Sequence, residues 1–367
     1  MTLTENTPLP PEKPRRIVGK HFRQRQLSSL SLKKVYFIDC QFSDLTLSRG
    51  DLRDCHFENC QFNRITLQQG QIENCTLRSS VLHNIDADNM SVYQLSCLEN
   101  DWVNCALNQC NIERWLLSNC QIRQARWQDI QLAYWTAENT PISDLVMTGG
   151  SLQDANWHAC RLQNTDWQQV VITRQVMGNC VMHDCRYQKI VSNTLVWSRC
   201  QFELTVLSYL SLINASFHHS VLKNCHLDHC DLSSALFSEA TLENCDLSHA
   251  QLRGAQFCDA KLIGCHLATA NLQQASLLRA QLEWCDLTEA NLSKADLRSC
   301  NLRTSSLQAS TIHQARLHGA QLQPLDITLA MPDPLLGQID SWYHRHQPGP
   351  KNQPTSFPIP SGASRYV

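Results

Sequence analysis

The sequence predicts an all-β solenoid in which the chain completes one coil every twenty residues. Counting in fives from Phe22 to Ile327 gives 62 positions, and 58 of them carry a large apolar residue. The four exceptions are Ala87, Cys97, Ala137 and Ser192. In residues 225–250 the position two places before each large residue holds alanine or cysteine. Phenylalanines of this series recur twenty residues apart in five pairs and ten residues apart in none.

A five-residue period excludes an α-helix as the repeating unit. Each helical residue advances by about 100°, so five steps rotate by about 140° and spread the apolar residues around the axis. In an extended chain, by contrast, residues two apart point to the same side. Each repeat therefore predicts a short strand with one small and one large inward residue, followed by two corner residues. At about 4.8 Å per coil, 62 repeats give a column roughly 75 Å long, which we expect to be stiff, filled and without a cavity.

The runs CDLSHAQLRGA and ANLSKADLRSC resemble the A-(D/N)-L-X-X motif of the pentapeptide repeat family. The resemblance implies a right-handed quadrilateral β-helix of about 15 coils, with the small residue and the Leu or Phe pointing inward. It covers nearly the whole chain, and it is most regular over residues 212–322.

The segments outside the repeat are short. Residues 1–21 predict a flexible basic arm, residues 22–329 the solenoid, residues 330–346 a capping helix, and residues 347–367 a tail rich in Pro, Gly and Ser. Asp333 is suited to the N-cap of that helix and Pro334 to its first turn. The tail is either a loose end or a peptide that docks on a partner. The candidate tail contacts are Trp342, Phe357, Ile359 and Tyr366.

Residues 86–200 form an irregular stretch rich in Trp and Met. Trp115 and Trp135 stand where a small residue belongs, whereas Ala137 occupies a large-residue position. Such exchanges conserve volume, so a repacked core is one interpretation. The other is a distorted segment whose aromatic side chains reach the surface to contact a partner.

Composition limits the compartment and the partners. Seventeen of the nineteen cysteines occupy the small position, where they alternate with alanine, and Cys258 should be the outward thiol. Cysteines in this pattern behave as small core residues, which favours a reducing, cytoplasmic compartment. A net charge of −2 and the absence of a long apolar run predict neither nucleic-acid binding nor a membrane span. Export by a leaderless route stays open.

One cluster of outward histidines and acids is a candidate interaction surface. The twenty-residue period places His226, Asp246, His266 and Asp286 in one ladder, with His229, His249 and Glu289 in a second ladder on the same face. We expect a solvated, hydrogen-bonded surface there and not a metal site, because ligands in a row do not converge on one ion. No catalytic or cofactor-binding motif is found, and on a solid column every candidate nucleophile would stand on a ridge. No cofactor and no enzyme activity are therefore expected.

The predicted function is a rod-like, non-enzymatic scaffold or adaptor of bacterial type that binds a protein partner. Homo-oligomerisation through the coil ends is also open. By resemblance to the family, two alternatives are a secreted effector or type VI secretion accessory protein, and a DNA mimic that protects a type II topoisomerase. A DNA mimic would need about one negative charge per 1.7 Å of its length, as duplex DNA has. This chain nearly balances its positive and negative charges.

Overall fold

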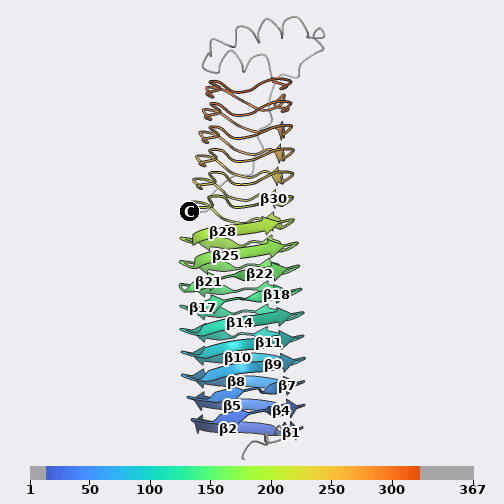
Figure 1. Cartoon of the computed structure of the whole chain (residues 1–367), viewed down its shortest axis with the longest axis vertical. Helices are drawn as coiled ribbons and strands as arrows, with labels where there is room; N and C mark the ends of the chain where they lie inside the picture. The colour runs from blue at the N-terminus through green and yellow to red at the C-terminus, as the bar shows by residue number, and fades with distance from the viewer. Residues whose placement is uncertain (1–13, 323–367) are drawn as a thin grey trace, which may run out of the picture. The chain divides into compact units, whose positions relative to one another are not determined.

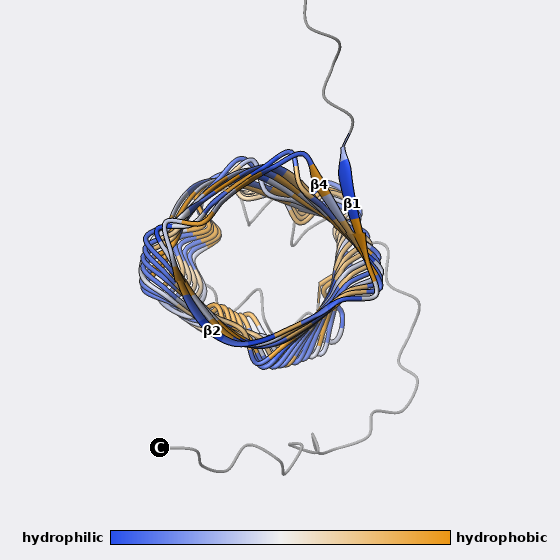
Figure 2. Ribbon diagram, turned by 90° about the horizontal axis from the view of Figure 1, so that it is seen from below, coloured by the Kyte–Doolittle hydropathy of each residue, from blue (hydrophilic) through white to orange (hydrophobic). Residues whose placement is uncertain are grey.

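The computed structural model describes residues 14–322, which form a continuous parallel β-solenoid (Figure 1). Residues twenty apart pair in register from Arg15↔Val35 at the N-terminal end to Asn301↔Gln321 at the C-terminal end. Residues 14–322 correspond to about fifteen coils of this length. Viewed along the axis, the coils superimpose on a single outline (Figure 2). The predicted twenty-residue coil is confirmed.

The strands are short and differ mainly in whether they span one repeat or two. Eight-residue strands, which span two repeats, are β2 (His21–Ser28), β5 (Gln41–Ser48), β8 (Gln61–Gln68), β9 (Gln71–Arg78), β10 (Val81–Asp88), β11 (Ser91–Leu98), β14 (Asn111–Ser118), β25 (Val171–Gly178) and β28 (Val191–Ser198). Four-residue strands are β1 (Arg15–Val18), β4 (Val35–Ile38) and β22 (Ala155–His158). The remaining strands have three residues: β3 (Ser31–Lys33), β6 (Asp51–Arg53), β7 (His56–Glu58), β12 (Asp101–Val103), β13 (Ala106–Asn108), β15 (Gln121–Arg123), β16 (Arg126–Gln128), β17 (Gln131–Ala133), β18 (Thr136–Glu138), β19 (Pro141–Ser143), β20 (Val146–Thr148), β21 (Ser151–Gln153), β23 (Arg161–Gln163), β24 (Asp166–Gln168), β26 (Val181–His183), β27 (Arg186–Gln188), β29 (Gln201–Glu203), β30 (Val221–Lys223), β31 (Thr241–Glu243), β32 (Lys261–Ile263) and β33 (Gln281–Glu283).

The solenoid begins earlier than the sequence predicts. Strand β1 lies inside the segment 1–21 that was expected to be a flexible arm, and it pairs with β4 in the next coil. The reason is that Ile17 already occupies a large-residue position, and it pairs with Phe37 one coil above. The predicted capping helix 330–346 and the tail 347–367 lie outside the described residues.

The corners explain why the outer positions tolerate almost any residue. The second corner residue of nearly every repeat has a positive φ, as at Asn84 (55°) and Asn104 (54°). Asn and Asp reach this left-handed region more readily than other non-glycine residues, which favours them at the corners. Gly150 is a stricter case: its φ is +78° and an added Cβ would lie 2.0 Å from the Ile130 carbonyl oxygen. Glycine is therefore required at residue 150.

Cysteine and alanine are not equivalent in the small position. From Leu212 onward most corners are closed by a turn hydrogen bond, such as that from Ala215 N to Leu212 O at 3.0 Å. In one column the large residue's carbonyl oxygen instead accepts a thiol from the next coil, as in Cys245 Sγ to Leu222 O at 3.4 Å. Ser305 Oγ makes the same contact with Leu282 O at 3.0 Å. In this column the thiol or hydroxyl takes the place of the turn hydrogen bond to the carbonyl oxygen. An alanine side chain has no donor that could make this contact.

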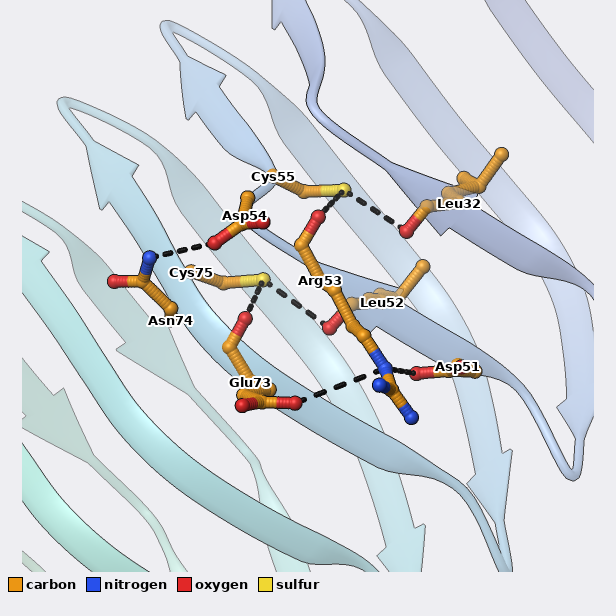
Figure 3. A network of polar contacts seen from close by, with 9 residues as sticks. All are labelled: Leu32, Asp51, Leu52, Arg53, Asp54, Cys55, Glu73, Asn74 and Cys75. Atoms are coloured by element: carbon orange, nitrogen blue, oxygen red, sulfur yellow. Dashed lines mark hydrogen bonds and ion pairs between the residues drawn. The ribbon is translucent and has the colours of Figure 1, made fainter. Parts of the chain in front are cut away.

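Figure 3 shows the same arrangement in two stacked coils near the N-terminal end. Cys55 Sγ donates to Leu32 O at 3.6 Å, and Cys75 Sγ repeats the contact one coil later with Leu52 O at 3.5 Å. On the outer side, Asn74 Nδ2 donates to Asp54 Oδ1 at 2.7 Å. Each coil therefore bonds to the next through inward thiols as well as through its backbone and its corner side chains.

The irregular middle is a repacked core. Its seven tryptophans and Tyr187 are buried, and the rings of these residues contact one another in a continuous series from Trp102 to Trp197. Tyr93 and Tyr134, which stand at outward positions, are exposed. Trp115 and Trp135, the two in small positions, stack with ring centroids 5.8 Å apart. Two polar residues in small positions accept hydrogen bonds from indole N–H groups. Trp167 Nε1 donates to Thr165 Oγ1, and Trp197 Nε1 donates to Gln175 Oε1, both at 3.1 Å.

The core is not filled throughout, so the expectation of a column without a cavity is wrong. An apolar cavity of about 140 Å³ lies inside the coils between Leu52 and Trp115. It coincides with Ala87, which has an alanine where the series calls for a large side chain. The sequence pattern gives the size of each residue one at a time. The free volume inside the solenoid depends on the side chains from all four sides of several coils, so the pattern could not predict this cavity.

Thiol labelling provides a direct prediction from the register. Eighteen of the nineteen cysteines are buried, and Cys258 alone is partly exposed. Burial also raises the pKa of the Cys60 and Cys105 thiols to about 11, which lowers the reactive thiolate fraction at neutral pH. A maleimide should therefore modify about one thiol per folded chain, at Cys258, and all nineteen in denaturant. Rapid modification of several thiols in the folded protein, detected by peptide mass spectrometry, would show that the predicted inward register is wrong.

Candidate interaction groove

A groove of about 740 Å³ runs along one corner of the solenoid. It spans coils whose strands run from β10 to β27. Its lining residues are His83, Asn84, Val103, Asn104, Gln124, Arg126, Asp144, Val146, Asn164, Thr165, Asp166, Asp184 and Arg186. The expectation that every candidate group stands on a ridge is therefore wrong for this part of the surface.

One wall of the groove is a ladder of corner amides and carboxylates. Asn84, Asn104, Gln124, Asp144, Asn164 and Asp184 follow one another at twenty-residue intervals. Neighbours bond along the axis: Asn104 Nδ2 donates to Asn84 Oδ1 at 2.6 Å, and Asn164 Nδ2 donates to Asp144 Oδ1 at 2.7 Å. Their positive φ angles fix the corner backbone. The ladder therefore presents polar groups at a regular spacing of about 4.8 Å.

The opposite wall carries charge. Arg126, Val146, Asp166 and Arg186 are consecutive partners in one column of parallel strands, β16, β20, β24 and β27. Asp166 Oδ2 accepts a hydrogen bond from Gln168 Nε2 at 2.8 Å. Arg126 and Arg186 are exposed and form no ion pair with any residue in the described range 14–322. Both guanidinium groups are thus available to a ligand at the surface.

The predicted histidine ladder continues this charged wall. Arg186 is followed in the same column by Val206 and then by His226, Asp246, His266 and Asp286, each paired with the next as predicted. We use the term groove face for the groove together with the outward residues that extend it to residue 289. These residues are Leu204, Tyr209, His226, His229, Asp246, His249, His266, Trp284, Asp286 and Glu289.

The second predicted ladder forms a stack of rings. His229 and His249 are nearly parallel, with centroids 4.6 Å apart and an interplanar angle of 11°. Tyr209 stacks on the other side of His229 at 4.7 Å. His249 Nδ1 lies 2.5 Å from Thr269 Oγ1, and Glu289 follows Thr269 one coil later. The rings support one another, so this ladder is ordered on the outside of the solenoid.

Three apolar side chains on the groove face were missed by sequence reasoning. Leu204, Tyr209 and Trp284 are 46%, 73% and 60% exposed. All three occupy the second corner position, where the positive φ favours Asn and Asp but does not exclude large apolar residues. A pattern search of the outward positions for Trp, Tyr and Leu could have found them. Exposed Trp and Tyr beside Arg are typical of protein-binding surfaces.

Two groups of histidines and acids converge more closely than a flat ladder would. His226, Asp228 and Asp246 have donor atoms within 4.8 Å of one another, as do His218, His219 and Glu239. Asp246 Oδ1 already accepts the Ser248 amide at 3.0 Å, and Asp228 accepts the Ser208 hydroxyl. Because existing hydrogen bonds occupy Asp228 and Asp246, we assign this first group to the polar surface of the groove face. In the second group, which lies outside the groove face, His219 forms an ion pair with Glu239.

The fold and its repeat define a class of protein: a parallel β-solenoid built from five-residue units, four to each coil. Comparison with protein-family models identifies the units themselves. Residues 195–272 match the model for a pentapeptide repeat region, and residues 265–304 and 285–323 match the model for pentapeptide repeats in eight copies. Residues 195–323 are therefore built from pentapeptide repeats, and the same twenty-residue register continues on their N-terminal side to Ile17.

Solved structures similar to this chain include pentapeptide repeat proteins. HetL, a pentapeptide repeat protein involved in heterocyst differentiation regulation in the cyanobacterium Nostoc, is 22% identical; the match covers 54% of this chain and 87% of HetL, with a TM-score of 0.22. A pentapeptide repeat protein of the Arabidopsis thaliana thylakoid lumen is 25% identical over 26% of this chain and 70% of its own, with a TM-score of 0.23. QnrB1, a plasmid-mediated fluoroquinolone resistance protein, is 11% identical over 62% of this chain and 98% of its own, with a TM-score of 0.21.

No significant match to a curated protein was found. Within residues 14–322 there is no helix of the length and apolar character that a membrane span requires.

Proposed function

We propose that the protein is a non-enzymatic scaffold whose groove face binds an extended segment of a partner protein. The observation that carries the proposal is the groove of about 740 Å³, which joins a ladder of hydrogen-bonding corner residues to two arginines that have no ion-pair partner among residues 14–322. A solenoid suits this role because outward side chains can vary without disturbing the stacked core.

The composition of the groove face supports a protein partner. Arg126 and Arg186 supply charge within the groove, while Tyr209 and Trp284 supply exposed aromatic surface farther along the same face. Arg, Tyr and Trp are the residues that most often dominate the binding energy of protein interfaces. Acids such as Asp144, Asp166 and Asp184 lie among the arginines, so the face favours a segment of mixed charge over a uniformly charged polymer.

The partner can be captured from the groove itself. A photo-crosslinking amino acid at Val146, within the groove, should trap a defined protein in cells of the native organism. The same amino acid at Arg199, an exposed corner position outside the groove face, is the matched control. Mass spectrometry of the two samples then identifies proteins that are specific to Val146.

Binding of the purified partner tests the role of the arginines. Arg126→Glu together with Arg186→Glu should weaken binding by at least about tenfold, equivalent to about 1.4 kcal/mol, whereas Arg199→Glu should leave the affinity unchanged. Circular dichroism and thermal unfolding establish that all variants are folded. Equal affinity of the wild type and the double variant, or identical crosslinks from both positions, would refute the proposal.

A further inference from the structure

The interior of the N-terminal coils is open to a degree that the rest of the column is not. Leu77, Leu82 and Leu107 occupy inward large-residue positions, and their exposed fractions are 8%, 6% and 8%. In the coils that follow, Leu117 and Leu152 are fully buried at 0%. Phe62 and Leu67 are only half-buried although both point into the column. Open space therefore lies beside these side chains, inside the coils.

This space is the apolar cavity of about 140 Å³. It is bounded by Leu, Ile, Val, Phe, Met, Cys, Ala and Trp side chains, and no polar atom faces it. Trp102, Leu107, Ile112 and Trp115 bound the cavity on the C-terminal side. Water would find no hydrogen-bonding partner there, so the cavity should be dry, as apolar cavities of this size are.

The missing side chain that creates the cavity can be identified. Ala87 lies in an inward column between Leu67 below and Leu107 above, and it pairs in register with both. Every other position of this column from Leu27 to Trp127 carries a leucine or a larger residue. The other alanine in a large-residue position, Ala137, has no such space, because Trp135 fills the adjacent small position and is buried at 0%.

We propose that the cavity between Leu52 and Trp115 is a binding site for one small apolar molecule of about the size of benzene. The volume and the lining both support this ligand class, since a dry apolar cavity of about 150 Å³ accepts benzene or xenon. No polar atom of the lining is exposed to the cavity and no charged residue borders it, so polar molecules of the same size are disfavoured. The site is independent of the groove face, whose residues point outward.

Xenon and benzene serve as probes with the full-length protein. Wild-type protein should shift the ¹²⁹Xe NMR signal in a saturable way, and saturating benzene should raise its melting temperature by mass action. Ala87→Leu should fill the cavity, abolish both responses and raise the melting temperature without ligand. Ala87→Val should reduce the responses only in part. The matched control, Ala137→Leu, overpacks a filled part of the core and should lower the melting temperature.

The variants also distinguish binding in this cavity from binding at a site elsewhere in the protein. The Arg126→Glu, Arg186→Glu protein, which alters only the groove face, should retain the full xenon and benzene responses. A wild-type protein without a saturable xenon shift would overturn the proposal. So would a folded Ala87→Leu or Ala87→Val protein that binds xenon as strongly as the wild type does.

Discussion

Replacing Phe237 by alanine should destabilise the solenoid by about 3–5 kcal/mol, the cost of removing a fully buried aromatic side chain. Phe237 is the middle ring of a stack, with Phe217 and Phe257 each 4.8 Å away and nearly parallel to it. Its exposure is 0%. In a column whose coils contact only their neighbours, the resulting void cannot be filled by a distant element, so the loss should be close to the full cavity cost.

The matched variant is Phe237→Leu, because leucine occupies most of the equivalent positions in the repeat. This change should cost less than about 1.5 kcal/mol. Urea unfolding of both variants gives the two free energies. Amide hydrogen exchange shows whether the loss is concentrated in the coils next to residue 237. If both substitutions cost the same small amount, the ring is not part of a tightly packed stack.

Alkaline pH should unfold the protein through its buried thiols. Burial raises the pKa of Cys60 and Cys105 to about 11, and that of Cys230 and Cys300 to about 12. In an unfolded chain a cysteine titrates near pH 8.5. Below that pH both states are protonated and the thiols do not affect stability. Between pH 8.5 and about 11 only the unfolded state releases these protons, so stability falls as the pH rises.

The expected loss is large because the thiols act together. Each one lowers the free energy of unfolding by about 1.4 kcal/mol per pH unit within this window, and the four together by roughly 5–6 kcal/mol per unit. A domain in the lower or middle part of the ordinary stability range of about 5–15 kcal/mol should therefore unfold before pH 11. Urea unfolding at half-unit steps from pH 7.5 to 10.5 measures the slope.

A single substitution tests the cause of this pH dependence. Cys300 makes the same turn hydrogen bond as the alanines of its region, from its amide to Leu297 O at 3.1 Å, so Cys300→Ala should be well tolerated. The variant should reduce the alkaline slope by the contribution of one thiol. Cys258→Ala is the matched control, because it removes the one partly exposed thiol and none of the buried ones. A wild-type stability that is flat up to pH 10 would contradict the role assigned to the thiols.

Local repetition made most of the fold predictable. A five-residue period is incompatible with a helical stripe, and the phenylalanine spacing fixed the coil length before any contact was known. The same reasoning left two interpretations for Trp115 and Trp135, a repacked core or a surface contact, and the structure buries both side chains. It also put His226, Asp246, His266 and Asp286 in one column, where the structure pairs them. Each of these inferences depends only on residues one coil apart.

Features that depend on several columns at once were not predictable. The cavity beside Ala87 depends on how four sides of neighbouring coils share the interior, and the groove depends on the outline of the coil between Asn84 and Arg186. Trp284 was missed because a second corner position accepts any residue that can adopt a positive φ, and its φ is 59°. The difference between cysteine and alanine was missed because it concerns which group satisfies a carbonyl oxygen one coil away.

Distances between spin labels test the stacked coil most directly. Cys258 is the only partly exposed native thiol, and Ser118 and Glu58 lie outward in its column, 140 and 200 residues earlier. With about 4.8 Å per coil, double electron–electron resonance on Ser118→Cys and Glu58→Cys proteins should give distances to Cys258 of about 34 and 48 Å. Both distances should have narrow distributions. Distances that do not grow in proportion to sequence separation would contradict a column that advances by one strand spacing every twenty residues.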